Sequence, residues 1–492
     1  MTNYGDDSPI AAFATVPGNS ALTLIRCSGK NSIELLSSIF SPKKINTAEG
    51  NTIVHGWIVE QGTENKKADE VLVSVFRAPK SYTGEDGFDI SCHGGYAAGK
   101  AVMTVLKDAG FRGALPGEFT FRAFMNGKID LTRSESVMEL VSAKTDESRR
   151  HAVLRLSGSL QKEISSIKAQ LVQVLAGAEI FLDYSEDEIS ADAEEIEGKL
   201  PNKEIAHNAL ARLKKLSASW QLERIFQEGI TLVIAGRPNA GKSSLFNFLL
   251  KEDRSIVTEI PGTTRDWIEA YADIQGIPIR LIDTAGLRDA PSDTSSGVVE
   301  KIGIERSRKI LQEADVVLYL IDGEQGITAE DEEELGIRNV ECGMRNEEFK
   351  REKTTYADKN KNILVLWNKC DIAPAPQPFP IANINPLSVS AKTGEGITEL
   401  YAAITSAVFK KTDGFQFEEH SSAALGTVRQ KNLTDAAVVR LEEALALDEQ
   451  DEPLDLIAPQ LREAVNLLGE ITGEVSTADI LEEMFSKFCV GK

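Results

Sequence analysis

Residues Thr231–Ser243 read TLVIAGRPNAGKS, a short apolar run that ends in glycine and continues into a glycine-rich loop. The loop Gly236–Ser243 fits the pattern G-x-x-x-x-G-K-[ST], and Ser244–Leu250 after it has the pattern of a helix. A strand, such a loop and a helix in that order predict a P-loop, whose backbone N–H groups surround phosphate oxygens. We expect Lys242 to reach the β- and γ-phosphates of a nucleotide and the Ser243 hydroxyl to coordinate Mg²⁺.

Three further signatures follow the P-loop. Asp283-Thr284-Ala285-Gly286 comes after an apolar run and resembles the Asp-x-x-Gly element of GTPases, whose Asp holds Mg²⁺ through water and whose glycine N–H contacts the γ-phosphate. Asn368-Lys369-Cys370-Asp371 resembles the guanine-reading element, in which the carboxylate accepts two N–H bonds that adenine does not offer. Ser390-Ala391-Lys392 resembles the last guanine-contact loop. The four signatures in this order predict a GTP-binding and GTP-hydrolysing domain.

The position after Asp-Thr-Ala-Gly bears on the mechanism of hydrolysis. Ras-like enzymes place a glutamine there to orient the attacking water, whereas this chain has Leu287, which has no polar group. Three downstream carboxylates are candidate substitutes: Asp289, Asp293 and Glu300. The alternative is a switch that needs an external activator, and these residues alone leave both alternatives open.

The bulk composition is ordinary for a globular protein of several domains. The chain has 492 residues, of which 42% are hydrophobic and 26% charged, and its length suggests three domains at roughly 100–200 residues each. No apolar run approaches the roughly 18–20 residues that cross a bilayer, and the polar N-terminus is not typical of a signal peptide. Five scattered cysteines without a CxxC pair indicate a reduced, cytoplasmic compartment. The net charge of −22 argues against non-specific nucleic-acid binding.

The hydrophobic pattern changes along the chain. Residues 1–130 alternate β-type runs, such as ALTLIR at Ala21–Arg26, with glycine-rich turns. Beyond Asp130, apolar residues recur at the three- and four-residue spacing of amphipathic helices, namely at Val153, Leu156, Leu160, Ile164, Ile167, Leu171 and Val174. Near the end of the chain a helical face is expected to carry Ile480, Leu481, Met484, Phe485 and Phe488.

These patterns predict an α/β and α multi-domain protein. Residues 1–130 form an α+β domain, and residues 131–226 and 411–492 form the two parts of a helical domain. Residues 227–410 form a Ras-like P-loop GTPase domain with a doubly wound sheet. This domain is inserted into the helical one, since insertion at an exposed loop is well tolerated.

Several segments resemble the MnmE (TrmE) family of tRNA-modification GTPases, and the resemblance covers nearly the whole chain. The N-terminal segments are SYTGED at 81–86, HGG at 93–95, PGEFT at 116–120 and RAFMNGK at 122–128. Those in the middle are 236–243, GTTRD at 262–266, 283–288 and KIGIE at 301–305, and the chain ends in FCVGK at 488–492. The terminal segments are far more specific than the GTPase motifs, which many translation and ribosome-assembly factors share.

The resemblance implies an activity and partners. Such proteins are potassium-dependent GTPases that work with an FAD-dependent partner, MnmG, and add an aminomethyl or carboxymethylaminomethyl group to carbon 5 of the wobble uridine of certain tRNAs. The carbon comes from a 5-formyl- or 5,10-methylene-tetrahydrofolate, and FAD and NADH act only through the partner. The N-terminal domain resembles folate-binding aminomethyltransferase domains and forms a homodimer, which joins MnmG in a heterotetramer.

The resemblance also assigns the residues of the GTPase site. Glu300 orients the attacking water, Lys242 is catalytic, and Mg²⁺ is held by Ser243 and Thr264. Potassium, in place of an arginine finger, is held by Asn239, Thr258, Ile260 and Thr263. The residues expected to contact GTP are Asn239, Ala240, Gly241, Lys242, Ser243, Ser244, Thr258, Glu259, Ile260, Pro261, Gly262, Thr263, Thr264, Asp283, Thr284, Ala285, Gly286, Asn368, Lys369, Asp371, Ser390, Ala391 and Lys392.

A second set of residues belongs to the one-carbon chemistry that the resemblance implies. The folate contacts fall on Arg26, Asp89, Lys128 and Lys492, where Asp89 stands in place of the usual Glu; basic side chains suit the glutamate tail of folate. For Arg26 and Lys128 the alternative is a plain surface charge. Cys489 matches a candidate catalytic cysteine whose thiolate attacks carbon 6 of uracil or captures a one-carbon unit. The alternative is a thiol buried beside Phe485 and Phe488.

Two other classes of GTPase remain as alternatives. A ribosome-assembly GTPase is expected to carry a basic RNA-binding domain, whereas residues 411–492 contain 17 Asp and Glu against 7 Lys and Arg. A membrane-remodelling GTPase is expected to have a basic amphipathic stretch or an anchor. The sequence therefore favours the tRNA-modification enzyme.

Overall fold

The computed structural model describes residues 4–60, 66–183, 200–252, 269–283, 314–335, 362–380, 384–409, 423–475 and 478–491. The chain forms two compact units. The first consists of Met1–Met138, Leu154–Ser217 and Thr427–Lys492, and the second of Glu139–Val153 and Ala218–Gly426. The larger part of the second unit therefore lies, along the sequence, between two parts of the first.

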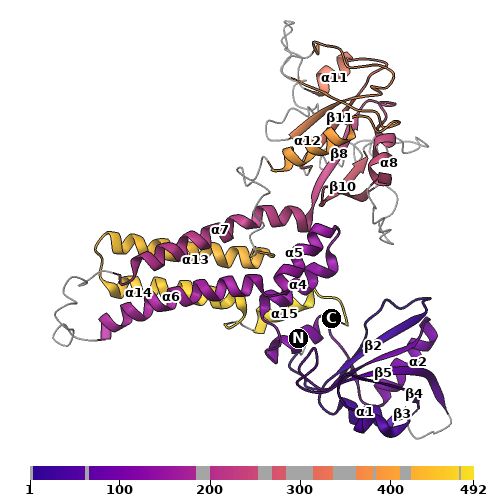
Figure 1. Cartoon of the computed structure of the whole chain (residues 1–492), viewed down its shortest axis with the longest axis vertical. Helices are drawn as coiled ribbons and strands as arrows, with labels where there is room; N and C mark the ends of the chain where they lie inside the picture. The colour runs from indigo at the N-terminus through magenta and orange to yellow at the C-terminus, as the bar shows by residue number, and fades with distance from the viewer. Residues whose placement is uncertain are drawn as a thin grey trace, which may run out of the picture. The chain divides into compact units, whose positions relative to one another are not determined.

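The first unit begins with a seven-stranded sheet in the order β3-β4-β5-β6-β2-β1-β7. The pairs are antiparallel except that of β1 with β7. The helices α1 (Ser32–Ser38) and α2 (Tyr96–Asp108) pack on one face of the sheet (Figure 1). The strands are β1 (Ile10–Phe13), β2 (Leu22–Ser28), β3 (Phe40–Ser41), β4 (Thr52–Val59), β5 (Lys67–Phe76), β6 (Gly87–His93) and β7 (Arg112–Gly113).

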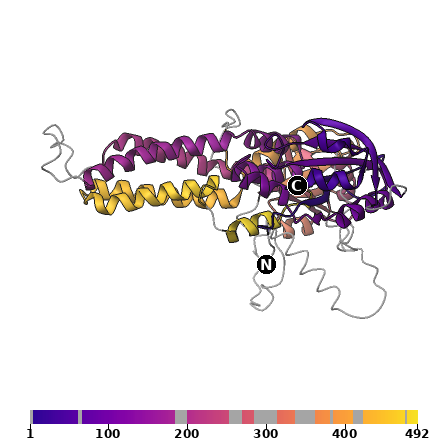
Figure 2. The same cartoon turned by 90° about the horizontal axis from the view of Figure 1, so that it is seen from below.

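The helices α6 (Ser159–Asp183), α13 (Val428–Glu449) and α14 (Leu454–Thr472) pack lengthwise, as both views show (Figures 1 and 2). Residues 203–217 of α7 (Lys203–Glu228) are held to α13 by the Ser217–Asp435 hydrogen bond. Leucine and isoleucine at helical spacing fill the interior, including Leu160, Ile164, Ile167, Leu171, Leu441, Leu461 and Leu468. The first unit also contains η1 (Lys43–Thr47), α3 (Glu118–Met125) and α15 (Ala478–Ser486), while α4 (Leu131–Ser142) and α5 (Asp146–Leu156) each contribute residues to both units.

Three details of the predicted helical pattern are wrong. One is Phe488, which lies beyond α15, since this helix ends at Ser486. The apolar run that begins at Val153 is divided, because Gly158 has a positive φ of 91° between α5 and α6; Val153 is 40% exposed. On α15, Leu481 and Phe485 are buried, but Ile480 is 41% exposed. A residue adjacent to a buried one lies about 100° further around a helix, so Ile480 falls outside the buried stripe.

The second unit contains a six-stranded sheet in the order β13-β12-β11-β8-β10-β9. All pairs are parallel except that of β9 with β10 at one edge. The helices of this unit include α8 (Lys242–Glu252), α11 (Ala329–Glu334) and α12 (Ile397–Phe409). The strands are β8 (Ile230–Gly236), β9 (Glu269–Ile274), β10 (Ile277–Asp283), β11 (Val316–Asp322), β12 (Asn362–Asn368) and β13 (Leu387–Ser388).

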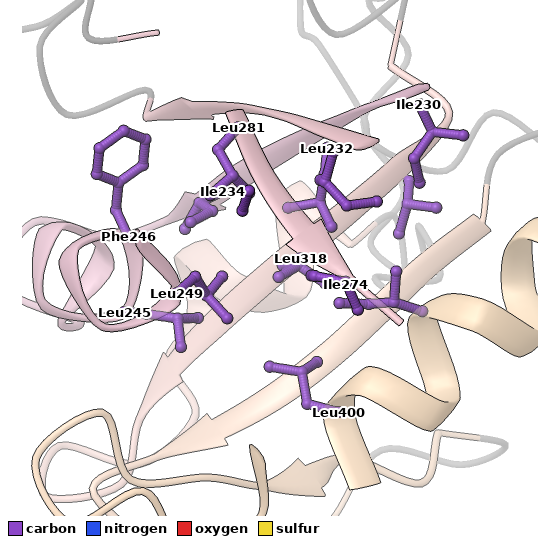
Figure 3. Packing of buried hydrophobic residues seen from close by; sticks show 14 of the residues in the cluster. Ile230, Leu232, Ile234, Leu245, Phe246, Leu249, Ile274, Leu281, Leu318 and Leu400 are labelled. Atoms are coloured by element: carbon purple, nitrogen blue, oxygen red, sulfur yellow. The ribbon is translucent and has the colours of Figure 1, made fainter. Parts of the chain in front are cut away.

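Both faces of this second sheet are buried. Leu232 and Ile234 of β8 point into a core that α8 and α12 complete (Figure 3), while Val233 and Ala235 face a second core with Tyr319. Burial on both faces explains why these strands are continuous apolar runs. The predicted fold class, α/β and α multi-domain with a doubly wound sheet, is confirmed.

Four neighbouring strands of this sheet end at the same edge, three of them with a polar residue and one with the first glycine of the P-loop. The carboxyl ends of β8, β10, β11 and β12 are Gly236, Asp283, Asp322 and Asn368. In doubly wound sheets, ligands bind at this edge. In the part of the chain that is described, no helix is both long and apolar enough to cross a membrane.

Candidate functional site

The P-loop connects β8 to α8 through three residues with positive φ. Gly236 and Gly241 have φ of 134° and 94°, and Asn239 has φ of 66°. A Cβ on Gly236 would lie 2.4 Å from the Leu320 carbonyl oxygen, and one on Gly241 would lie 2.1 Å from Asn368 Nδ2. The loop therefore requires glycine at both positions, for its backbone angles and for these close approaches.

Lys242, at the start of α8, is enclosed by this loop. The residue is 8% exposed, and its Nζ donates to the carbonyl oxygens of Gly236 at 3.0 Å and Arg237 at 2.8 Å. An ammonium at the N-terminus of a helix, beside a curled backbone, forms a site for phosphate.

The next residue along α8, Ser243, meets the end of β10. Its hydroxyl donates to Asp283 Oδ2 at 2.9 Å, and Asp283 is 3% exposed. A hydroxyl and a carboxylate so close to a phosphate loop provide the oxygen ligands that Mg²⁺ takes. The structure thus brings together two residues that the sequence assigned to the magnesium side of the site.

Asn368 joins three of the four signatures. Its Nδ2 donates to the Ala240 carbonyl oxygen in the P-loop at 2.7 Å, and its Oδ1 accepts from the N–H of Ala391 at 3.4 Å. Ser390 is fully buried, and its hydroxyl oxygen accepts from the backbone N–H of Lys392 at 3.3 Å. The phosphate loop and the two guanine loops are therefore fixed to one another through a single buried amide.

The remaining guanine-side residues differ in exposure. Asp371 is exposed, and its carboxylate accepts no hydrogen bond within the described residues, so it is accessible to a base. Lys369 has a φ of 62°, and its Nζ donates to Asp322 at 3.0 Å and to Glu324 at 2.7 Å. Hydrogen bonds to Glu324 and Asp322 raise the pKa of the Lys369 ammonium. Asp322 is the last residue of β11 and Glu324 follows it; neither belongs to a signature, so sequence reasoning missed them.

A large part of the predicted site lies outside the described residues. This applies to the candidate water-orienting Glu300 and to its alternatives Asp289 and Asp293. It also applies to Thr258, Glu259, Ile260, Pro261, Gly262, Thr263, Thr264, Thr284, Ala285, Gly286 and Lys492.

The described folate candidates lie on the first sheet and beside it. Arg26 of β2 and Asp89 of β6 are partners in the antiparallel register and form an ion pair, with Nε 3.2 Å from Oδ1. Lys128 is exposed, and its Nζ donates to the Pro79 carbonyl oxygen at 2.8 Å. A Cβ added to Gly84 would lie 3.4 Å from the Lys128 side chain. Burial raises the pKa of Tyr82, which is in the same loop as Gly84.

The end of the chain is docked on the PGEFT segment. The Gly117 N–H donates to the Cys489 carbonyl oxygen at 3.2 Å, and Val490 bridges Pro116. Phe485 and Phe488 are buried, but Cys489 is exposed. The alternative of a buried thiol is therefore wrong, because the two phenylalanine rings pack in the core while Cys489 is exposed.

A buried ion network connects the N-terminal segments that carry the resemblance. Glu118 is fully buried and accepts from Arg112 at 2.7 Å and from Arg122 at 3.0 Å. Arg122 also donates to Glu85 at 3.2 Å, and Ser28 donates to the same Glu85 oxygen at 2.8 Å. The network fixes the SYTGED loop beside the PGEFT segment, a pairing that residue spacing did not predict.

Family models and relatives match nearly the whole chain. The family model described as "GTP-binding protein TrmE N-terminus" matches residues 9–128, and the "MnmE helical domain" matches residues 131–489. The protein named tRNA modification GTPase MnmE from Treponema denticola is 42% identical, over 99% of both chains. That of Carboxydothermus hydrogenoformans is 38% identical, over 99% of this chain and all of the relative. The chain therefore belongs to the MnmE (TrmE) family of tRNA modification GTPases.

Proposed function

We propose that this chain is a potassium-dependent GTP hydrolase that acts, with an FAD-dependent MnmG-type partner, on the wobble uridine of certain tRNAs. Together they add an aminomethyl or carboxymethylaminomethyl group to carbon 5 of the base. The observation that carries the proposal is the convergence of the P-loop, Asp283 and the two guanine loops at one edge of a doubly wound sheet, with Asn368 hydrogen-bonded to two of these loops.

The division of labour follows the domains. We assign tetrahydrofolate binding and dimerisation to residues 1–130, and GTP hydrolysis to residues 227–410. Residues 131–226 and 411–492 are the two parts of the helical domain. The buried network of Glu118 and Arg122 lies within residues 1–130, and the six-stranded sheet with Lys242 at the start of α8 lies within residues 227–410.

In the GTPase site, the described residues fit a nucleotide with Mg²⁺. Lys242 binds phosphate oxygens, Ser243 supplies a hydroxyl ligand with Thr264 as the second, and Asp283 lies 2.9 Å from the serine hydroxyl. Asp371 accepts from the guanine base. Glu300 is assigned to orienting the attacking water, since Leu287 has no group that can do so.

Asn239 is the side-chain ligand that we assign to potassium, with Thr258, Ile260 and Thr263 completing the site. Its φ of 66° places it in the sharp bend of the P-loop, and its amide oxygen is a ligand suited to a hard cation. Potassium, when bound, supplies positive charge where negative charge develops between the β- and γ-phosphates.

The one-carbon chemistry is assigned to the first unit. Arg26, Asp89, Lys128 and Lys492 are proposed to hold a 5-formyl- or 5,10-methylene-tetrahydrofolate; the Arg26–Asp89 pair provides both signs of charge on one sheet face. Cys489 is proposed as the catalytic thiol. Cys489 is exposed, so a substrate can reach its thiol. The hydrogen bond from the Gly117 N–H to the carbonyl oxygen of Cys489 holds its backbone in place.

An open sheet face supports the proposed homodimer. Opposite the face that α1 and α2 cover, Leu22, Ile53 and Leu72 are 61%, 68% and 47% exposed. Apolar residues exposed together on a sheet mark an interaction surface, and a two-fold contact buries the same patch on both subunits. The dimer is proposed to join the MnmG-type partner in a cytoplasmic heterotetramer.

The GTPase proposal is tested by comparing hydrolysis rates in equal concentrations of potassium and sodium chloride. We expect potassium to stimulate hydrolysis and sodium not to do so. The matched variant is Asn239→Gly, which keeps the positive φ but removes the amide oxygen; it should lose the potassium stimulation while still binding GDP. Equal rates in the two salts would contradict the proposal.

A further inference from the structure

A segment that belongs to no nucleotide signature contacts both halves of the nucleotide site. Residues Asp322–Asp331 (DGEQGITAED) run from the end of β11 into α11. One end of the segment holds an arginine of the P-loop, and the other end holds the lysine of the guanine loop. Each end is built around a buried carboxylate, since Asp322 is 2% exposed and Asp331 is fully buried.

The end formed by Asp331 immobilises Arg237. Asp331 accepts from Arg237 Nε at 3.0 Å and from the Tyr319 hydroxyl at 3.0 Å. Arg237 Nη2 donates to the Gly326 carbonyl oxygen at 2.9 Å, and the Thr328 N–H donates to Asp331 at 2.9 Å. The guanidinium is therefore held at two of its nitrogens, by the side chain of Asp331 and by the backbone of the same segment.

The position of Arg237 affects the position of the Lys242 ammonium, which is expected to bind phosphate. It is the second residue of the P-loop, and the Lys242 Nζ donates to its carbonyl oxygen at 2.8 Å and to that of Gly236 at 3.0 Å. Asp331 thus fixes the side chain of the residue whose backbone holds Lys242. A displaced Arg237 would move the point from which Lys242 reaches a phosphate.

The end formed by Asp322 fixes the guanine loop. Asp322 and Glu324 both accept from Lys369 Nζ, and the Gly323 N–H donates to the Asn368 carbonyl oxygen at 3.0 Å. A Cβ on Gly323 would lie 2.6 Å from that same oxygen. Lys369 has a positive φ, and such a conformation in a non-glycine residue persists only where its surroundings impose it.

We propose that Asp322–Asp331 is a brace that sets the affinity for the guanine nucleotide. Asp331 acts as a positioning residue for the phosphate loop, and Asp322 acts as a positioning residue for the loop that carries Asp371. Neither residue is assigned a contact with the nucleotide, and the inference rests on the proposed binding of guanine nucleotide at the P-loop.

The two ends of the brace predict different changes in selectivity. In the full-length protein, dissociation constants are measured for GDP and for inosine diphosphate, whose base lacks the 2-amino group that is proposed to donate to Asp371. Asp331→Asn should weaken the binding of both nucleotides about 10-fold, the scale of losing a charge-assisted hydrogen bond. The dissociation constant of inosine diphosphate divided by that of GDP should stay unchanged. Asp322→Asn should weaken the binding of GDP more than that of inosine diphosphate, so that the dissociation constant of inosine diphosphate divided by that of GDP falls.

Three comparisons make the outcome decisive. Arg237→Lys keeps the charge but cannot reach both Asp331 and the Gly326 carbonyl oxygen with separate nitrogens, and it should repeat the effect of Asp331→Asn if the latter does not fold. Asp448→Asn removes another buried carboxylate, one that accepts from the Leu200 N–H and from Lys203, and it should leave both constants unchanged. Unchanged constants in Asp331→Asn and Arg237→Lys, or a lower ratio in Asp331→Asn, would overturn the brace. A wild-type protein that binds no GDP would instead overturn the proposed function.

Discussion

Asn368 is the residue at which three loops of the nucleotide site meet. Its amide group donates to the P-loop and accepts from the Ser390–Lys392 loop, while its own backbone ends β12. A buried amide satisfied on both sides stabilises an arrangement whose parts are far apart in the chain, and loss of one partner leaves the other unpaired in a buried site.

Asn368→Ala should weaken GDP binding about 10- to 100-fold, because two buried hydrogen bonds that hold the loops together are lost. The measurement is the dissociation constant of a fluorescent GDP analogue. The matched control is Asn362→Ala, which removes an amide at the start of the same strand, β12, that donates to the Ala407 carbonyl oxygen of α12 at 2.7 Å. Equal affinity in Asn368→Ala and Asn362→Ala would contradict the role given to Asn368.

His93, at the end of β6, provides a test by pH. The hydrogen bond that His93 Nδ1 donates to Asp69 Oδ1 at 2.7 Å and the charge of that carboxylate raise the pKa of His93. A raised pKa means that the pair stabilises the fold fully below the ordinary value of about 6.5, and that this contribution is lost as the pH rises through the raised pKa. An NMR titration should show the raised pKa in the wild type and a lower one in Asp69→Asn. The same pKa in both proteins would exclude the pair.

Single residues also show how far the sequence predicts the site. Lys242, Ser243, Asp283, Asn368 and Asp371 were predicted because each belongs to a short pattern with its own chemistry. The pair Arg237–Asp331 spans 94 residues and the pair Glu135–Arg429 spans 294. Pairings of that kind depend on how strands and helices are arranged in space, which local spacing does not encode.

At the scale of elements, the sheet of the second unit was predicted from its strands, because buried parallel strands are continuous apolar runs. Its ligand-binding edge was predicted from the motifs that follow these strands, because ligands bind at the carboxyl ends of the strands. The helices were predicted from their apolar spacing, but the break between α5 and α6 was not. Val153, Leu156 and Leu160 keep a helical spacing across Gly158, so the periodicity alone does not show that the backbone turns there.

Gly158 is therefore a direct test of what ends α5. Gly158→Ala should lower the stability of the first unit by about 1–2 kcal/mol, because its φ of 91° is strained for a residue with a Cβ, while the nearest atom to that Cβ is at an ordinary 3.5 Å. Urea unfolding followed by circular dichroism measures the change. Gly113→Ala, where no atom lies within 4 Å and φ is not positive, should have little effect. Equal stability of the two variants would show that the backbone conformation of Gly158 carries no strain.

At the scale of the whole molecule, the nucleotide site lies in a unit whose sequence interrupts the unit that carries Cys489 and the folate candidates. We propose that GTP controls the proposed uridine chemistry and does not take part in it. In a homodimer formed through residues 1–130, the two GTPase domains are proposed to cover each other's nucleotide sites, a self-complementary contact.

Spin labels on the two GTPase domains of the dimer test this proposal. Glu399 on α12 is exposed and suits a label as Glu399→Cys, in a chain whose native cysteines are replaced. The distance between labels should shorten distinctly when GDP, aluminium fluoride and potassium are added, and it should not shorten when sodium replaces potassium. A monomer by light scattering at micromolar concentration, or one distance distribution in all conditions, would contradict the coupling.

The central claim is that GTP hydrolysis by this chain serves the modification of tRNA wobble uridines. The most direct measurement is mass spectrometry of nucleosides from the tRNA of cells that lack the chain, complemented with the wild type or with Lys242→Ala. The account predicts that the uridines modified at carbon 5 disappear without the chain, return with the wild type and stay absent with Lys242→Ala. Uridine modification that persists in cells without the chain, or full restoration by Lys242→Ala, would contradict it.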